Sequence, residues 1–548
     1  MPENIAPEGD DSVPDPVQTE ETARAEAMAR TELEEYLLIS EQRRRLFPRA
    51  ALVGLGAGLL AVVFRFLLQG SEELRASIYT MAKGLGPLGI LAPIAFSALA
   101  ATVAVALSKI YAPETAGSGI PHLKSVLHRV REQNWARVLL AKMLGGTLAI
   151  GGGLALGREG PTLQMAGACG DAIGRLLKSP PRERLTLIAA GAGAGLAAAF
   201  NAPLAGLIFV LEEVQRDFRR TVFGAAFLSA AVADVVTRLA CGQDPIFTVP
   251  IYPAPAMQAL PAFALLGILA GILGVLFNKT LLAGLTLFSP LKGWRLLWAT
   301  AVVGGAVGAT GWFFPDVIGT GHHLAEGVLR GEMAFTIVPV FFLARYALTM
   351  VSYSTGAPGG IFAPLLVLGA MAGLWFGQFA GVVFPHLVPD VAVFGVVGMA
   401  AYFTGIVRAP LTGVVLILEM TGSYELMLPL LVSCFCAYAA ANALRDLPIY
   451  EALLQRDLRR APSGHFLKEP LILELEVEPG SRFEGKLVRE LGLPPGCILL
   501  RIADGAHEAI PTADSRLPRF ARITAVVAPE ASRGVALLRQ GCEASHEA

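Results

Sequence analysis

Long stretches without a single Asp, Glu, Lys or Arg dominate this sequence. They cover residues 84–108, 185–211, 245–278, 346–389, 391–407 and 426–444. About 20 apolar residues are enough to cross a bilayer. Only 16% of the chain is charged, against about 25% in soluble domains. The sequence therefore predicts an all-α, polytopic membrane protein, because a helix satisfies its own backbone hydrogen bonds in lipid.

Glycine and proline interrupt almost every one of these apolar stretches. The chain contains 59 glycines, and residues 151–153 and 357–360 are examples of such breaks. Irregular backbone at membrane depth is tolerated only where protein buries it or where it lines a polar cavity. We therefore expect tilted, discontinuous helices whose N-termini direct unpaired N–H groups toward whatever occupies that cavity.

One motif recurs in the two halves of the chain. The pattern Ala-Pro-Leu-x-Gly, four apolar residues and Leu-Glu occupies residues 202–212 and again residues 409–419. A Gly-x-x-x-Pro turn lies upstream of each copy, at 157–161 and 360–364. These paired matches indicate an internal duplication. Interrupted segments at corresponding positions of two halves indicate a transporter's binding site, so we predict that the two turns build that site together.

A single carboxylate lies inside the first of these turns. Glu159 belongs to the sequence Gly-Arg-Glu-Gly-Pro at 157–161, between a glycine-rich run and a new apolar segment. An ionisable group at membrane depth costs free energy, so its presence there suggests a functional role. The alternative is a carboxylate that caps a helix N-terminus, which needs no coupling to any transported ion.

Three short stretches resemble the signature sequences of the CLC family of chloride channels and chloride/proton antiporters. They are Gly-Ser-Gly-Ile-Pro at 117–121, Gly-Arg-Glu-Gly-Pro at 157–161 and Gly-Ile-Phe-Ala-Pro at 360–364, in the family's order and spacing. The resemblance implies a homodimer with one pore per subunit. Each subunit would be an inverted repeat of tilted, broken helices within residues 31–460, with repeats at roughly 50–240 and 255–445.

The resemblance also implies a chloride site. Ser118 would donate its hydroxyl to the central anion, Tyr450 would donate its phenol from the cytoplasmic side, and the backbone N–H groups of Ile361 and Phe362 would complete the site. Neutral donors suit a mobile anion because a full counter-charge would hold it too tightly. Taken alone, Ser118 would more often cap a helix. The supporting residues of the signature stretches are Gly117, Gly119, Pro121, Gly157, Arg158, Gly160, Pro161, Gly360 and Pro364.

Two carboxylates carry the implied proton coupling. Glu159 resembles the gating glutamate, which competes for the anion site when ionised and swings aside when protonated. Glu213 matches the family's internal proton-transfer glutamate, which antiporters keep and channels generally replace. This favours a chloride/proton antiporter. A passive voltage- or pH-gated chloride channel and a ligand sensor with vestigial transport are the alternatives, and Glu213 could instead be a charged helix end exposed to the cytoplasm.

Lys142 also matches a lysine of the family. It stands alone in an apolar stretch. We expect it either to raise the positive potential beneath the anion path or to snorkel toward the membrane surface.

Basic residues flank the apolar region on both sides and predict its orientation. By the positive-inside rule both termini face the cytoplasm, in a multi-pass protein of the plasma membrane. The first thirty residues are acidic, and we expect a disordered tail over 1–30. A charged helix should follow over 31–46. The basic residues are Arg43, Arg44, Arg45 and Arg49 before the first run, and Arg445, Arg456, Arg459 and Arg460 after the last.

The chain changes character after Pro462. Strand-like segments at 471–477, 497–502 and 523–528 and helix-like segments at 485–491 and 530–539 predict a small α+β cytoplasmic domain over 465–548. It resembles the C-terminal sensing module of bacterial potassium-transport regulators (TrkA-C type), although Arg519-Phe520 replaces the Gly-Asp usual there. The domain would bind an unknown small ligand or serve only in dimerisation.

Other function classes lack their usual patterns. The six cysteines form no C-x-x-C pair, and His322-His323-x-x-Glu326 has no further ligands to hold a metal. The apolar runs contain no nucleophile–His pair of the kind that would indicate an enzyme. The sequence also has no basic patch interleaved with aromatic residues, which would indicate nucleic-acid binding. We expect no metal and no cofactor. The expected partners are chloride, protons, the lipid membrane and a second copy of the chain.

Overall fold

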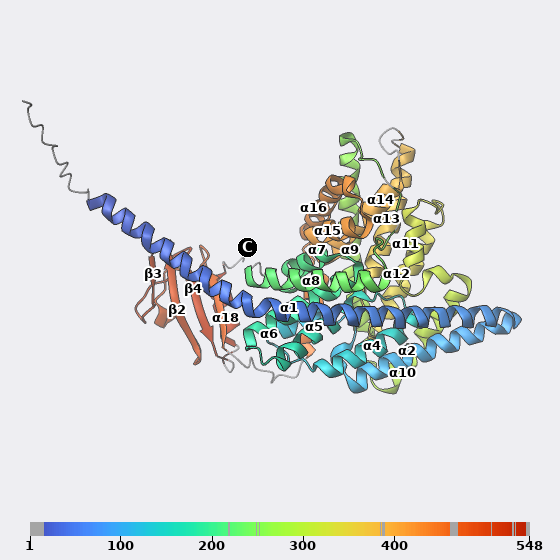
Figure 1. Ribbon diagram of the computed structural model, residues 1–548, viewed down its shortest axis with the longest axis horizontal. Helices are drawn as coiled ribbons and strands as arrows, with labels where there is room; N and C mark the ends of the chain where they lie inside the picture. The colour runs from blue at the N-terminus through green and yellow to red at the C-terminus, as the bar shows by residue number, and fades with distance from the viewer. Residues whose placement is uncertain are drawn as a thin grey trace, which may run out of the picture.

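The computed structural model describes residues 16–543, apart from residues 217–219, 248, 251, 384, 386–389, 461–469, 506, 529, 530 and 532. A helical bundle fills most of the long axis, and a small sheet lies at one end of it (Figure 1). The first half of the bundle consists of α1 (Pro16–Lys83), α2 (Leu91–Tyr111), α3 (Ile120–Leu127), α4 (Trp135–Gly151), α5 (Glu159–Leu176), α6 (Pro181–Phe200), α7 (Pro203–Phe209) and α8 (Arg220–Cys241).

The second half of the bundle repeats this order of long and short helices. It ends in a helix that leads toward the C-terminal domain. Its elements are α9 (Leu260–Phe288), α10 (Trp294–Phe313), α11 (His322–Leu329), α12 (Val338–Ser354), α13 (Phe362–Val383), α14 (Ala392–Val407), α15 (Pro410–Thr421), α16 (Met427–Ala443) and α17 (Ile449–Arg460).

Only some of these helices are long and apolar enough to cross a membrane. Among the described residues there are seven such segments. By contrast α3 has 8 residues, α7 has 7 and α15 has 12, far fewer than the roughly 20 that a crossing requires. The prediction of discontinuous helices is therefore confirmed. The seven segments are Arg44–Lys83, Gly86–Tyr111, Val222–Cys241, Met257–Phe288, Trp294–Phe313, Phe362–Val383 and Tyr424–Ala443.

The duplicated motif forms the same structure in both halves. The helix before each copy ends in a left-handed residue, Asn201 after α6 and Arg408 after α14. Each copy then starts a short helix with proline in its first turn, at Pro203 and Pro410. Proline suits that position because its missing N–H is not needed there.

The two copies also cap each other. The Glu212 carboxylate accepts hydrogen bonds from the N–H groups of Leu411 (3.2 Å) and Thr412 (2.8 Å) at the start of α15. In return the Glu419 carboxylate accepts from the N–H groups of Leu204 (3.1 Å) and Ala205 (2.8 Å) at the start of α7. Each half of the molecule thus supplies the negative charge that the other half's helix N-terminus favours.

The chain after α7 widens into a π-helical turn. Val210–Val214, here η3, is a π-helical turn that contains both Glu212 and Glu213. Such turns change the direction of successive side chains and are frequent at functional sites. Glu212 reaches α15 from this turn, while Glu213 is buried on another side of it.

The N-terminal segment departs from the expectation. We expected a disordered tail over residues 1–30, but α1 starts at Pro16 and continues unbroken through the expected 31–46 helix to Lys83. Residues 16–30 are rich in Ala, Glu and Arg, which are strong helix formers, and their acidity did not prevent helix formation. Residues 1–15 lie outside the described part of the chain.

The C-terminal domain is an antiparallel sheet with one helix packed on it. The strands β1 (Leu471–Glu476), β2 (Cys497–Asp504), β3 (His507–Ala509) and β4 (Arg522–Val527) lie in the order β1-β4-β2-β3, and α18 spans Arg533–Cys542. Its core is separate from that of the bundle and includes Leu473, Phe483 and Leu538. The expected strands and final helix are present. The helix expected at 485–491 is only a single turn, Val488–Glu490, and the short strand β3 was missed.

Candidate ion pathway

Backbone hydrogen bonds join the three signature stretches. Gly157 N–H donates to the Gly360 carbonyl (2.7 Å) and Gly360 N–H donates back to the Gly157 carbonyl (2.8 Å). Gly359 N–H donates to the carbonyl of Gly117 (3.1 Å). The helices α3, α5 and α13 each begin within three residues of these bonds. Their N-termini therefore converge, and helix N-termini favour anions.

Two of the glycines are required by this close approach. A methyl group on Gly160 would lie 2.8 Å from the Ser118 carbonyl oxygen. One on Gly119 would lie 2.1 Å from Gln164 Oε1, and Gly119 also has a left-handed φ of 84°. Any side chain at these positions would push α5 away from the loop that carries Ser118.

Ser118 is buried at the start of α3. It is 1% exposed, and its own N–H donates to the Tyr353 hydroxyl at 3.4 Å. Its Oγ accepts a long contact from Ile120 N–H, also 3.4 Å, and the Tyr353 hydroxyl also interacts with this side chain. This distance exceeds the usual range for an N–H···O bond, so the capping alternative has weak geometric support.

The Glu159 carboxylate lies at the N-terminus of α13. Its Oε2 accepts a hydrogen bond from Ala363 N–H (3.2 Å), and the residue is 3% exposed. Ala363 directly follows Ile361 and Phe362, the residues whose N–H groups we expected to hold chloride. The carboxylate therefore binds an N–H group adjacent to the two expected to hold an anion.

Tyr450 brings a phenol to the same region. It is fully buried near the start of α17, and its hydroxyl has no hydrogen-bond partner among the described residues. A buried polar group without a partner costs about 1–3 kcal/mol. An anion that accepted from this hydroxyl would remove that cost.

Aromatic rings connect Tyr450 to the start of α13, where the N–H groups of Ile361 and Phe362 lie. The Tyr450 ring packs edge-on against Phe209 with centroids 6.5 Å apart, and Phe209 packs against Phe362 at 5.9 Å. Phe200 and Phe403 contact Phe362 at 5.2 and 4.7 Å. These contacts place the start of α17 and the start of α13 on one side of the same apolar cluster.

Lys142 is buried rather than snorkelling. Its Nζ donates to the carbonyls of Thr115 (2.8 Å) and Gly117 (2.7 Å), and the side chain is inaccessible. The snorkelling alternative is wrong because the loop before Ser118 offers these carbonyls inside the protein. By binding them, Lys142 fixes the loop that presents Ser118.

Glu213 is buried too, so the alternative of an exposed helix end is wrong. Its side chain is 1% exposed, and its Oε1 accepts from Lys124 Nζ at 2.8 Å. Lys124 also contacts Glu451. We did not anticipate Lys124 or Glu451. The available signal was a lone lysine three residues after Pro121, and a glutamate directly after Tyr450.

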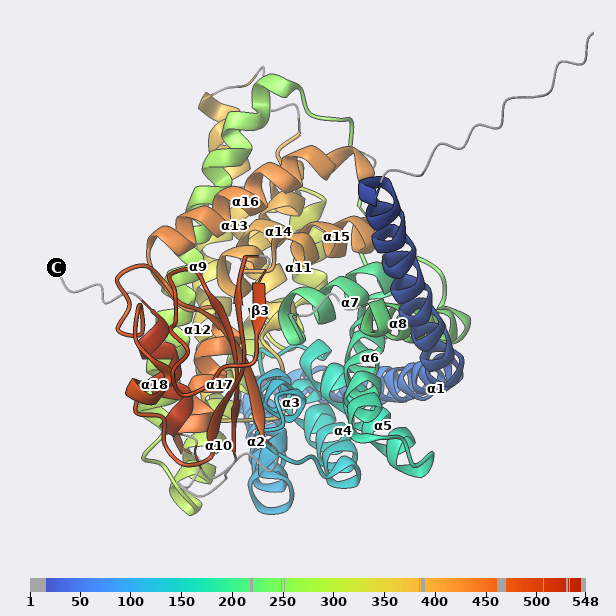
Figure 2. The same ribbon diagram turned by 90° about the vertical axis from the view of Figure 1, so that its left-hand side faces the viewer.

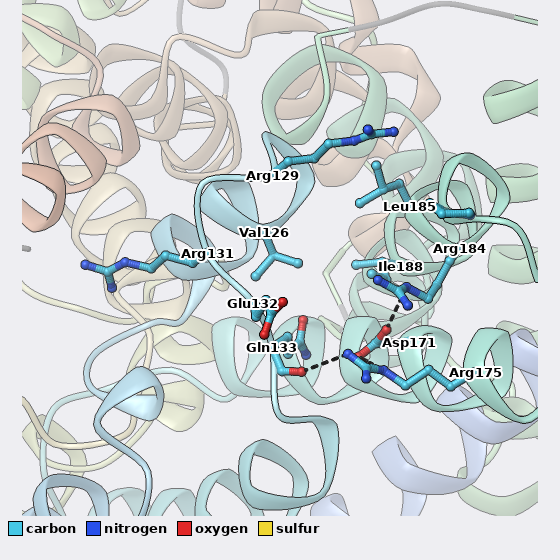
Figure 3. Close-up of a pocket in the computed structure, with 11 residues that line it drawn as sticks. Val126, Arg129, Arg131, Glu132, Gln133, Asp171, Arg175, Arg184, Leu185 and Ile188 are labelled. Carbon is cyan, nitrogen blue, oxygen red and sulfur yellow. Dashed lines mark hydrogen bonds and ion pairs between the residues drawn. The ribbon is translucent and has the colours of Figure 1, made fainter. Parts of the chain in front are cut away.

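A separate hollow of about 140 Å³ opens beside the loop between α3 and α4. Asp171 in its wall pairs with Arg175 (3.0 Å) and Arg184 (3.3 Å), whereas Arg131 points away from Asp171 (Figure 3). The Arg131 guanidinium instead donates to the Asp457 carbonyl of α17 (3.1 Å). The hollow does not include the candidate anion-site residues, and its arginines fix the loop against α5, α6 and α17.

Comparison with known proteins agrees with this arrangement. The family model described as "Voltage gated chloride channel" matches residues 99–442. The "H(+)/Cl(-) exchange transporter ClcA" of Vibrio parahaemolyticus is 40% identical over 417 residues, which is 75% of this chain and 89% of that protein. The protein of the same name from Salmonella paratyphi A is 37% identical, over 77% of this chain and 92% of its own length.

The chain belongs to the CLC family.

Solved CLC structures confirm the predicted fold. A slow cyanobacterial Cl⁻/H⁺ antiporter has 34% sequence identity and a TM-score of 0.74, over 76% of this chain and 99% of its own. A eukaryotic CLC transporter has 27% identity and a TM-score of 0.64, over 77% and 74% of the two chains. The family match ends before the C-terminal domain, so the TrkA-C resemblance stays a prediction.

Proposed function

We propose that this CLC protein is a chloride/proton antiporter. The observation that carries the proposal is the position of Glu159, whose carboxylate accepts from Ala363 N–H at the start of α13. When ionised, Glu159 competes with chloride for these donors. When protonated, it loses most of its attraction to them, because hydrogen bonds to a charged acceptor are roughly twice as strong. One residue thereby exchanges a proton for an anion, and no covalent bond changes.

The anion site of this proposal consists of neutral donors. Ser118 Oγ, the Tyr450 hydroxyl and the N–H groups of Ile361 and Phe362 hold chloride, with Glu159 above them. The partnerless Tyr450 hydroxyl and the long Ser118 contact support these two assignments. An ion held by donors of this kind can bind and still leave.

Antiport needs a second proton site on the cytoplasmic side, and we assign it to Glu213. Its burial beside Lys124 supports this role. The relatives described above are exchange transporters and an antiporter, which favours exchange over a passive channel. Chloride and protons then share the path near Glu159 and separate toward the cytoplasm.

We further propose a homodimer in the plasma membrane with both termini in the cytoplasm. The N-terminal end of α1 and the C-terminal sheet lie toward the same end of the long axis (Figure 1), which supports the shared side. Cross-linking in native membranes tests the dimer. For the domain at 465–548 we propose a cytoplasmic TrkA-C-like module that regulates or dimerises the transporter.

Flux in proteoliposomes tests the function directly. A chloride gradient is imposed across vesicles that contain the purified protein, and the external pH is recorded. We expect protons to move against their own gradient while chloride runs down its gradient. Chloride flux without any uphill proton movement would establish a channel instead.

A further inference from the structure

A buried lysine bridges two carboxylates on the cytoplasmic side of the anion site. Lys124 Nζ lies 2.8 Å from Glu213 Oε1 and 2.6 Å from Glu451 Oε1. The side chains of Lys124 and Glu213 are each 1% exposed, whereas that of Glu451 is 25% exposed. The three groups therefore form a continuous hydrogen-bonded series from solvent to the buried carboxylate.

Three separate elements build this series. Lys124 comes from α3, Glu213 from η3 and Glu451 from α17. The helix α3 packs against α17, and the two lie close together in Figure 2. Glu451 also directly follows Tyr450, so the series begins beside the cytoplasmic end of the anion site.

The charges around the series balance. Arg216 contacts Glu451 Oε1 at 2.8 Å and Glu213 Oε2 at 3.7 Å. Two cations thus face two carboxylates, and His128 at the end of α3 faces Lys124, Glu451 and Arg216 as well. A buried charge without a partner is strongly destabilising. Both carboxylates can therefore be ionised at rest, and each can accept a proton when one arrives.

We infer that Glu451 is the port through which cytoplasmic protons reach Glu213, and that the Lys124 ammonium passes them from one carboxylate to the other. The inference rests on the proposed proton-transfer role of Glu213. It adds the group that takes protons from solvent and the group that links it to the buried site.

The transfer balances in protons. A cytoplasmic proton binds the Glu451 carboxylate. The Lys124 ammonium gives one proton to the Glu213 carboxylate, and the resulting amine takes the proton from the Glu451 carboxylic acid. Glu451 returns to its carboxylate and Lys124 to its ammonium, so the net change is one proton gained by Glu213. Both distances lie within the range in which a positioned group transfers a proton directly.

Glu451→Gln tests the port. Glutamine keeps the shape and the hydrogen bond but cannot take up a proton. We expect coupled proton flux to fall by about a hundredfold, the order contributed by a positioned acid or base, while Glu451→Asp retains measurable coupling. Normal coupling in Glu451→Gln would overturn the inference.

Lys124→Arg tests the link. Arginine preserves the positive charge between the carboxylates but does not deprotonate in proteins. A relay through the lysine predicts loss of proton flux in Lys124→Arg. If coupling is retained there but lost in Glu451→Gln, Lys124 only positions the carboxylates and its transfer role is overturned.

Two further variants complete the experiment. Glu183→Gln is the matched control, because Glu183 is a partly buried carboxylate that pairs with Arg49 far from this series; it should couple normally. Glu213→Gln separates the two levels of the proposal. Retained coupling in Glu213→Gln would contradict the proton-transfer role proposed for Glu213, on which the port rests. Lost coupling in Glu213→Gln together with normal coupling in Glu451→Gln would contradict only the port. Chloride flux and size-exclusion elution of each variant report folding.

Discussion

In the proposed mechanism Glu159 couples two ions through one carboxylate, which competes with chloride for N–H donors at a helix start. In Glu159→Gln the side chain keeps its shape and never carries a charge. We expect chloride to permeate while proton coupling and pH dependence disappear, with proton flux at least about a hundredfold lower. Paired chloride and pH recordings on one preparation measure this. Retained proton pumping would contradict the gating role.

Ser118 is expected to set anion preference. Its hydroxyl is the only neutral side-chain donor in the first signature stretch, and Ser118→Pro removes it. A hydrogen bond to a charged group contributes about 1.5–3 kcal/mol, so nitrate use relative to chloride should rise roughly tenfold or more. The nitrate-to-chloride flux ratio in liposomes is the measurement. An unchanged ratio would leave Ser118 as a helix cap.

Glu213→Gln should stop proton movement while chloride still flows. The change removes a titratable group without touching the donors of the anion site. A variant of the anion site, such as Ser118→Pro, should instead affect the chloride flux itself, and so serves as the comparison. Proton flux that stays coupled in Glu213→Gln would show that another residue carries the cytoplasmic proton.

At the level of single residues the sequence indicated candidate site residues but not the side chains that support them. Signature motifs marked Ser118 and Glu159 because their chemistry is local to short loops. Lys124 and Glu451 were missed because they meet only in the folded chain, 327 positions apart in sequence. The burial of Lys142 was likewise invisible, since a sequence does not show which carbonyls a loop turns inward.

At the level of elements, the duplicated motif indicated an internal duplication, and the structure adds the paired short helices and their exchanged caps. Glu212 and Glu419 are the last residues of the repeated pattern, yet their partners lie in the opposite copy. No pattern within one copy indicates this exchange. Conversely, acidity alone led to the wrong expectation for residues 16–30, where helix propensity and continuity with α1 prevailed.

Removing one cap should destabilise the protein without abolishing ion transport. In Glu419→Ala the N–H groups of Leu204 and Ala205 lose their acceptor. The expected cost is about 0.5–2 kcal/mol, seen as a lower melting temperature in detergent. Glu212→Ala should cost a similar amount at α15. Glu425→Ala, at an exposed position, is the control, and an equal loss there would rule out a specific capping effect.

At the level of the whole molecule, the C-terminal domain has its own core and its own chemistry. Cys542 in α18 is 1% exposed. Burial raises the pKa of its thiol to about 11, and the charges of Glu543 and Glu478 add to this effect. Because the thiolate is the reactive form, the thiol stays protonated and unreactive below that pH.

Alkylation therefore reports whether this domain is folded. At pH 8 we expect maleimide to modify the partly exposed Cys497 of β2 much faster than Cys542, with the difference abolished in denaturant. Peptide mass spectrometry measures both sites in one sample. Equal rates in the native protein would show that α18 does not pack on the sheet.

The exchanged caps have a consequence for biosynthesis. Glu419 lies 215 positions after Leu204, whose N–H group it accepts. Ribosomes add about 5–20 residues per second. Glu419 is therefore synthesised roughly 10–40 s after the N-terminus of α7 that it caps. During that interval the first half cannot complete its final structure, because those N–H groups lack the acceptor that they have in the folded chain. The two halves are therefore completed together, once the second copy of the motif has been made.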